Sequence, residues 1–79
     1  MTLSDLSIGK VAIVDQISLG YHGQGLITRL EAMGITPDKP IRVLRKAWLG
    51  GPLHIRVGIT TEIAIRRREA EKVLIRMEG

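Results

Sequence analysis

Apolar and polar residues alternate along several short segments, which is typical of strands with one buried face. The pattern is clearest where Leu53, Ile55 and Val57 are separated by His54 and Arg56. A strand is predicted in each of five segments that alternate or are rich in β-branched residues, namely residues 10–17, 41–47, 52–58, 60–66 and 73–78. Apolar residues of both parities in residues 10–17 predict a strand covered on both faces.

One segment, residues 26–34, has helical spacing instead. Its apolar stripe consists of Leu26, Ile27, Leu30 and Met33. Gly34 follows the last of them, where helices commonly end in a residue with positive φ. Because so short a helix is marginal alone in water, we expect the stripe to dock on the sheet.

The remaining segments complete a small β fold. Residues 66–72 are charged and predict a helical turn before the last strand, and residues 36–40 predict a tight turn. Five short strands must not leave long bare edges, and curling the sheet into a barrel removes them. We therefore expect a mainly β fold, a small barrel of about five strands with a short helix after the first strand. The 79 residues fit one domain, residues 1–79.

Composition narrows the function classes. The chain has no cysteine, which excludes disulfides, thiolate zinc sites and cysteine nucleophiles and favours a reducing cytoplasm. It has no apolar run of the roughly 18 residues that a membrane span needs. The net charge of +4 favours an acidic partner surface.

Residues that could perform chemistry are few. His22 and His54 are the only histidines, and they lie on different predicted elements. Because a zinc site needs three or four convergent ligands, we expect two exposed polar residues and no metal site. A weak metal contact that also uses surface carboxylates stays open as an alternative, in a metal-handling role.

The glycine-rich segment of residues 18–25 precedes the predicted helix, as phosphate-binding loops do. It lacks the Gly-Lys-Ser/Thr sequence of such loops, so we expect a flexible surface loop. No serine has a recognisable histidine or carboxylate partner, and no pair of carboxylates suggests acid–base work. We expect neither a catalytic site nor a cofactor.

The segment "WLGGPLHIRVG", residues 48–58, places the only tryptophan of the chain before two glycines and a proline. Trp48 can be a lid packed on the core, since tryptophan is highly buried on average. It can equally be an interface anchor, since tryptophan and arginine are common at binding hot spots. In that second interpretation Leu49, Arg66 and Arg67 belong to the same partner-binding surface.

Four pieces of sequence give the chain a family resemblance. In order they are "LSIGKVAIV", "RLEAMGITPDKPIRVLRKA", "LGGPLHIRV" and "EIAIRRREAEKVLI", and together they cover nearly the whole chain. The chain resembles FeoA proteins, small cytoplasmic accessories of bacterial ferrous-iron transport. Asp38 departs from the glycine that the family commonly has in this turn, and Trp48 from a smaller residue or proline.

The resemblance implies an SH3-like barrel and a non-catalytic role. It also implies a partner, the cytoplasmic G-protein domain of the membrane transporter FeoB. The chain would bind this partner without inserting into the membrane, and a homo-oligomer is possible. An alternative is a nucleic-acid-binding barrel or a domain related to iron-dependent repressors. Nucleic-acid binding is not expected, because one tryptophan and one tyrosine offer few stacking platforms.

Overall fold

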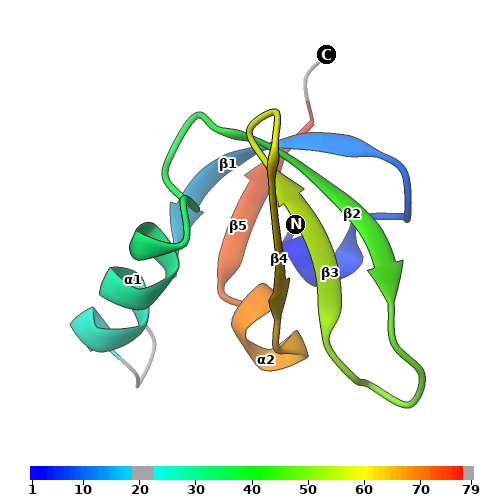
Figure 1. The fold of residues 1–79 in the computed structure, drawn as a ribbon. Helices are drawn as coiled ribbons and strands as arrows, with labels where there is room; N and C mark the ends of the chain where they lie inside the picture. Colours follow the sequence, from blue (N-terminus) through cyan, green and yellow to red (C-terminus); the bar gives the residue numbers. More distant parts are fainter. Residues whose placement is uncertain (19–22, 78–79) are drawn as a thin grey trace.

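The computed structural model describes residues 1–18 and 23–77. Its elements follow the predicted order (Figure 1). They are a 3-10 helix η1 (Leu3–Asp5), strand β1 (Val11–Ile17), helix α1 (Gly23–Ala32), strands β2 (Pro40–Lys46), β3 (Leu53–Val57) and β4 (Thr61–Ile65), helix α2 (Arg67–Ala70) and strand β5 (Val73–Arg76). The mainly β fold, with a helix after the first strand and a helical turn before the last, is confirmed.

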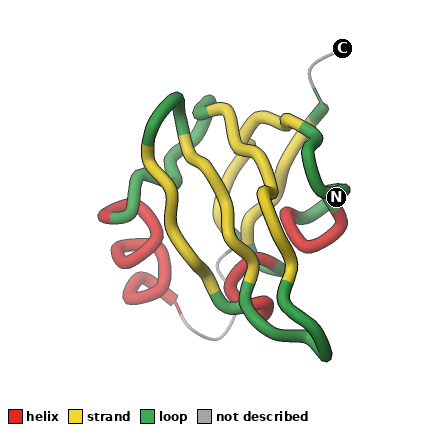
Figure 2. Tube along the Cα trace, turned by 45° about the vertical axis from the view of Figure 1, so that its right-hand side comes forward, coloured by secondary structure: helices red, strands yellow, loops and turns green. Residues whose placement is uncertain are grey.

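The strands form one antiparallel sheet in the order β4-β3-β2-β1-β5. The register shifts between Val14 and Gln16 in β1 and between Val43 and Arg45 in β2. Such bulges increase the local twist and bend a strand. The sheet is accordingly strongly curled, with α1 beside it (Figures 1 and 2).

The curl brings all five strands around one aliphatic core. The predicted inward face of β3 is confirmed, because Leu53, Ile55 and Val57 are all buried. In β1 the core face is that of Ala12 and Val14, whereas Val11 on the other face is exposed. The expectation that this strand is covered on both faces is therefore wrong. The remaining buried core residues are Leu3, Leu6, Leu30, Ile35, Ile41, Val43, Ile65, Ala70, Val73 and Ile75.

The N-terminal segment, which precedes the first predicted strand, contributes to this core. Leu3 and Leu6 are almost completely buried. The carbonyl of Met1 accepts a hydrogen bond of 3.0 Å from the N–H of Ile75 in β5. The segment therefore covers β5, an edge strand of the sheet.

Helix α1 begins earlier than predicted. It starts at Gly23 rather than Leu26, so the expected loop of residues 18–25 is wrong for residues 23–25. Residues 19–22, with His22, lie outside the described part. Leu30 is buried, whereas Leu26 and Ile27 are only half-buried. The helix therefore docks mainly through its C-terminal half.

Gly34 ends α1 as predicted, with φ of +92°. Its N–H bonds to the carbonyl of Glu31 at 2.9 Å, and the N–H of Ile35 reaches back to the carbonyl of Leu30 at 3.0 Å. This is a Schellman motif, in which the residue after the glycine packs on the last turn. Because Leu30 and Ile35 are both fully buried, the motif fixes the end of the helix to the core.

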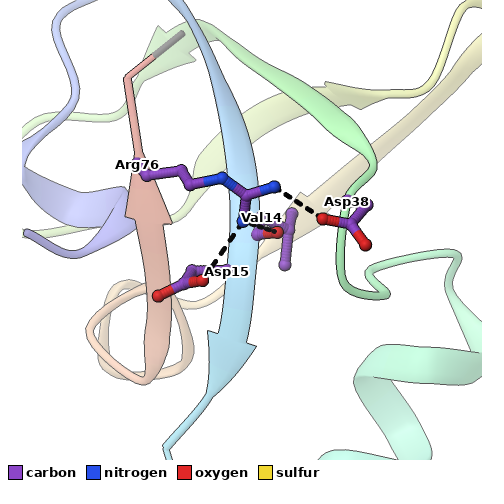
Figure 3. A network of polar contacts seen from close by, with 4 residues as sticks. All are labelled: Val14, Asp15, Asp38 and Arg76. Carbon is purple, nitrogen blue, oxygen red and sulfur yellow. Dashed lines mark hydrogen bonds and ion pairs between the residues drawn. The ribbon is translucent and has the colours of Figure 1, made fainter.

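The turn before β2 contains Asp38, which has φ of +70°, as expected of an aspartate in place of glycine. Figure 3 shows how Arg76 of β5 reaches this turn. Its guanidinium bonds to Asp38 at 2.5 Å, to Asp15 at 3.1 Å and to the carbonyl of Val14 at 3.4 Å. The pKa of Arg76 is raised, and the main cause is its hydrogen bond to Asp38. The network joins β5, β1 and the turn, but its exposure to solvent limits its effect on stability.

A charge at Leu30 should unfold the domain, and a charge at Leu26 should not. Leu30→Asp puts an unpaired carboxylate in the core, which costs several kcal/mol against a stability of roughly 5–15 kcal/mol. At half-buried Leu26 the carboxylate stays partly hydrated. Thermal unfolding followed by circular dichroism compares the two, and equal losses would contradict the docking described here.

Alanine should have opposite effects on stability at Gly34 and at Gly25. Gly34→Ala should destabilise by about 1–2 kcal/mol through its left-handed φ alone, because its Cβ would meet only Val57 Cγ1 at 3.8 Å. Gly25→Ala meets no atom within 4 Å and should stabilise α1 by roughly 0.5–1 kcal/mol. Urea midpoints measure both; a neutral Gly34→Ala would show that the left-handed turn carries no cost.

Candidate interaction site

The loop between β2 and β3, residues 47–52, extends beyond the sheet (Figures 1 and 2). At its tip the side chain of Trp48 is 90% exposed and that of Leu49 is 99% exposed. The interpretation of Trp48 as a lid on the core is therefore wrong. The structure instead presents two large apolar side chains to solvent.

The tip is a tight turn with an unfavourable residue in it. The N–H of Gly51 bonds to the carbonyl of Trp48 at 3.1 Å, and both central residues have positive φ, 55° at Leu49 and 75° at Gly50. Turns of this kind prefer Asn-Gly or Gly-Gly in the centre. A leucine in the left-handed region costs roughly 1–3 kcal/mol. Since Leu49 is fully exposed, burial of its side chain does not offset that cost.

The base of the loop is closed tightly. The N–H of Ala47 bonds to the carbonyl of Pro52 at 3.0 Å. A Cβ atom on Gly51 would lie only 2.8 Å from the Cβ of Ala47, so a larger residue there would force the loop apart. Of the two glycines in the loop, Gly50 has the positive φ that the turn requires, and Gly51 allows the close approach to Ala47.

Two long cationic side chains connect the base of the loop to other elements, α2 and η1. Arg67 of α2 donates from Nη2 to the carbonyl of Ala47 at 3.4 Å, and Lys46 donates from Nζ to the carbonyl of Ser4 at 3.2 Å. The Nε of Arg67 is buried and has no hydrogen-bond partner in the described part of the chain. Arg67 is thus brought to the Trp48–Leu49 loop, as the prediction of a shared surface requires.

Arg66, by contrast, belongs to a different surface. It lines a pocket of about 280 Å³ between the start of α1 and α2. The other lining residues are Gly25, Leu26, Arg29, Arg68 and Glu69. The four residues predicted to share one surface therefore divide between the loop, with Trp48, Leu49 and Arg67, and this pocket.

Glu69 is the residue that the sequence interpretation missed. It is only 4% exposed, although it lies in the charged run of residues 66–72. Its carboxylate accepts a hydrogen bond from Arg29 Nη1 of α1 and one of 2.9 Å from the N–H of Arg66. The signal was its position three residues after Arg66, where an acidic side chain caps the start of a helix.

His54, the histidine within the described part of the chain, belongs to no cluster of potential metal ligands there. His54 is half-buried, and its Nδ1 lies 3.3 Å from Nη2 of Arg45. No cluster of three or more potential ligands occurs in residues 1–18 and 23–77. The same residues contain no helix with the length and apolar character to cross a membrane.

A curled five-stranded antiparallel sheet with a short helix defines a small SH3-like domain. The FeoA domain family model matches residues 1–77, and the chain belongs to this family. The resemblance found in the sequence is thereby confirmed, and membership supports a role in ferrous iron transport.

Solved structures agree with this assignment. FeoA from Stenotrophomonas maltophilia complexed with zinc is 30% identical, with a TM-score of 0.80 over 95% of this chain and 88% of that one. An iron uptake regulatory protein, also called FeoA, is 36% identical, with a TM-score of 0.82 over 96% and 95%. A manganese-dependent transcriptional repressor has a TM-score of 0.86 over 99% of this chain and 41% of its own, but at 17% identity it shares the fold alone. A comparison with curated proteins gave no match.

Removing Arg29 should show that the buried carboxylate depends on it. Arg29→Met leaves Glu69 buried without its counter-ion and should destabilise the protein by about 3 kcal/mol. Arg56→Met is the control, because it removes an ion pair of 3.0 Å with Glu62 that is exposed and is worth at most about 1 kcal/mol. Chemical denaturation measures both variants, and similar losses would contradict a special role for the Arg29–Glu69 pair.

Proposed function

We propose that this protein is a non-catalytic accessory of bacterial ferrous iron transport that acts in the cytoplasm. Its partner in this proposal is the cytoplasmic part of the FeoB transporter, which it binds through Trp48 and Leu49. Membership of the FeoA family supports the transport role. The exposed tip of the β2–β3 loop supports this choice of surface.

One observation carries the choice of surface. The tip exposes two large apolar side chains, and one of them, Leu49, also has a strained left-handed backbone. Leaving two large apolar side chains in water gains nothing for folding, and the left-handed Leu49 adds strain. Both costs can be recovered if a partner buries the tip, because a buried tryptophan is among the strongest hot-spot residues. The hydrogen bonds at the base hold the tip in place before binding, which reduces the entropy lost on association.

Charge complements this apolar contact. Arg67 lies at the base of the loop, and the chain carries a net charge of +4. An acidic surface on the partner would be attracted at long range and would then meet the apolar tip. This arrangement fits a polar rim around an apolar centre.

An accessory role fits the side chains better than catalysis does. In the described residues no serine hydroxyl is hydrogen-bonded to a histidine or a carboxylate. The buried carboxylate of Glu69 has partners for both oxygens and caps α2. We assign Glu69 a structural role.

Trp48→Ala should weaken binding to the cytoplasmic domain of FeoB by about 2 kcal/mol or more, roughly 30-fold. The free energy of unfolding should change by less than about 0.5 kcal/mol, because the indole is exposed. Isothermal titration calorimetry and thermal melting measure these two quantities on the same preparation.

Ile59→Ala is the matched control, since Ile59 is 87% exposed and lies in the turn between β3 and β4. This turn and the β2–β3 loop lie at opposite ends of β3 (Figure 1). The Ile59→Ala change should leave the affinity unchanged. If folded Trp48→Ala protein binds with wild-type affinity, the loop tip is not the binding surface. If the wild-type protein does not bind at all, FeoB is not the partner. Salt-dependent binding to generic DNA in that case would favour the nucleic-acid alternative.

A further inference from the structure

The pocket between α1 and α2 is distinct from the Trp48–Leu49 loop and has a chemistry of its own. Three arginines, Arg29, Arg66 and Arg68, line it together with Glu69. With one carboxylate against three guanidinium groups, the lining carries a formal charge of +2. Like charges gathered around one cavity repel each other, and an anion in the cavity would relieve that repulsion.

The carboxylate of Glu69 cannot serve all three cations. One of its oxygens is occupied by Arg29 and the other by the backbone N–H of Arg66. The guanidinium groups of Arg66 and Arg68 have no hydrogen-bond acceptor in the described part of the chain, and both residues are exposed. Arg29 remains about half exposed and uses only part of its donor capacity on Glu69. The guanidinium groups of all three arginines therefore have N–H donors that could bind a ligand in the pocket.

Gly25 provides a second and independent observation. It lies within α1, where glycine is a poor helix former, and it lines the same pocket. Its φ is not positive, and a Cβ atom there would meet no atom within 4 Å. Within the described residues, neither the backbone nor the packing requires a glycine at this position. A ligand that approaches the first turn of the helix would require one.

We propose that this pocket binds a phosphate group, as the free ion or as part of a small phosphate ester. A phosphate carries a charge of about −1.5 to −2 at neutral pH, which matches the formal charge of the lining. Guanidinium groups recognise phosphate oxygens with paired, charge-assisted hydrogen bonds. The half-buried Leu26 adds an apolar wall, and a volume of about 280 Å³ suits a small ligand. The proposal does not depend on the FeoB interaction.

The test is an NMR titration of the ¹⁵N-labelled full chain with inorganic phosphate, at constant ionic strength kept with sodium chloride. We expect saturable shifts of the Gly25 amide and of the Nε–H signals of Arg66 and Arg68. Arg66→Gln and Arg68→Gln should each weaken the affinity about tenfold, the loss expected for one charge-assisted hydrogen bond. Both side chains are exposed, so the variants should stay folded, which their spectra show directly.

Two controls separate a built pocket from general attraction to a basic protein. Arg42→Gln makes the same change of charge at an exposed arginine of β2 outside this pocket, and should change the affinity less than about twofold. Sodium acetate should bind more weakly than phosphate. Shifts that do not saturate, or an Arg42→Gln loss as large as the others, would overturn the site. Equal affinity for acetate would overturn the assignment to phosphate.

Discussion

Both of the proposed binding surfaces depend on the contacts of the buried Glu69 carboxylate. Helix α2 has only four residues and could not persist alone in water. Glu69 holds it by accepting the N–H of Arg66 at its start and the guanidinium of Arg29 from α1. Ala70, the next residue, is fully buried in the core. Glu69 and Ala70 thereby fix the helix to α1 and to the core.

The arginines before Glu69 then diverge from this fixed point. Arg66 and Arg68 line the pocket beside α1, whereas Arg67 bonds to Ala47 at the base of the β2–β3 loop. Arg67 and Arg68 are successive residues of the helix and are therefore rotated by about 100° from each other, whereas Arg66 precedes the helix and has extended backbone. One short helix can therefore serve a pocket on one side and a hairpin on the other.

The alternation of apolar residues was sufficient to predict the strands, because a half-buried strand has a period of two whichever sheet it joins. Gly34 and Asp38 were also predictable, since a helix end and a tight turn each require positive φ locally. These features depend on neighbours in the sequence. The same local signals placed α1, although its start was misjudged by a few residues.

Features that depend on distant contacts could not be predicted in this way. The burial of Leu3 and Leu6 depends on the sheet, and in particular on β5, which their segment covers. Glu69 looks solvated until Arg29 of α1 faces it across the fold. The direction of the Trp48 indole depends on the turn at Leu49 and Gly50, where a leucine with positive φ runs against local preference.

The central claim, that the tip of the β2–β3 loop contacts the partner, can be tested on a single NMR signal. The chain has one tryptophan, so the ¹⁵N-labelled protein gives one indole N–H resonance, that of Trp48. On addition of the unlabelled cytoplasmic domain of FeoB, this resonance and the amides of residues 47–51 should shift or broaden first. The amides of the opposite turn, residues 58–60, should stay unchanged. A complex that forms with the indole resonance unperturbed would contradict the account.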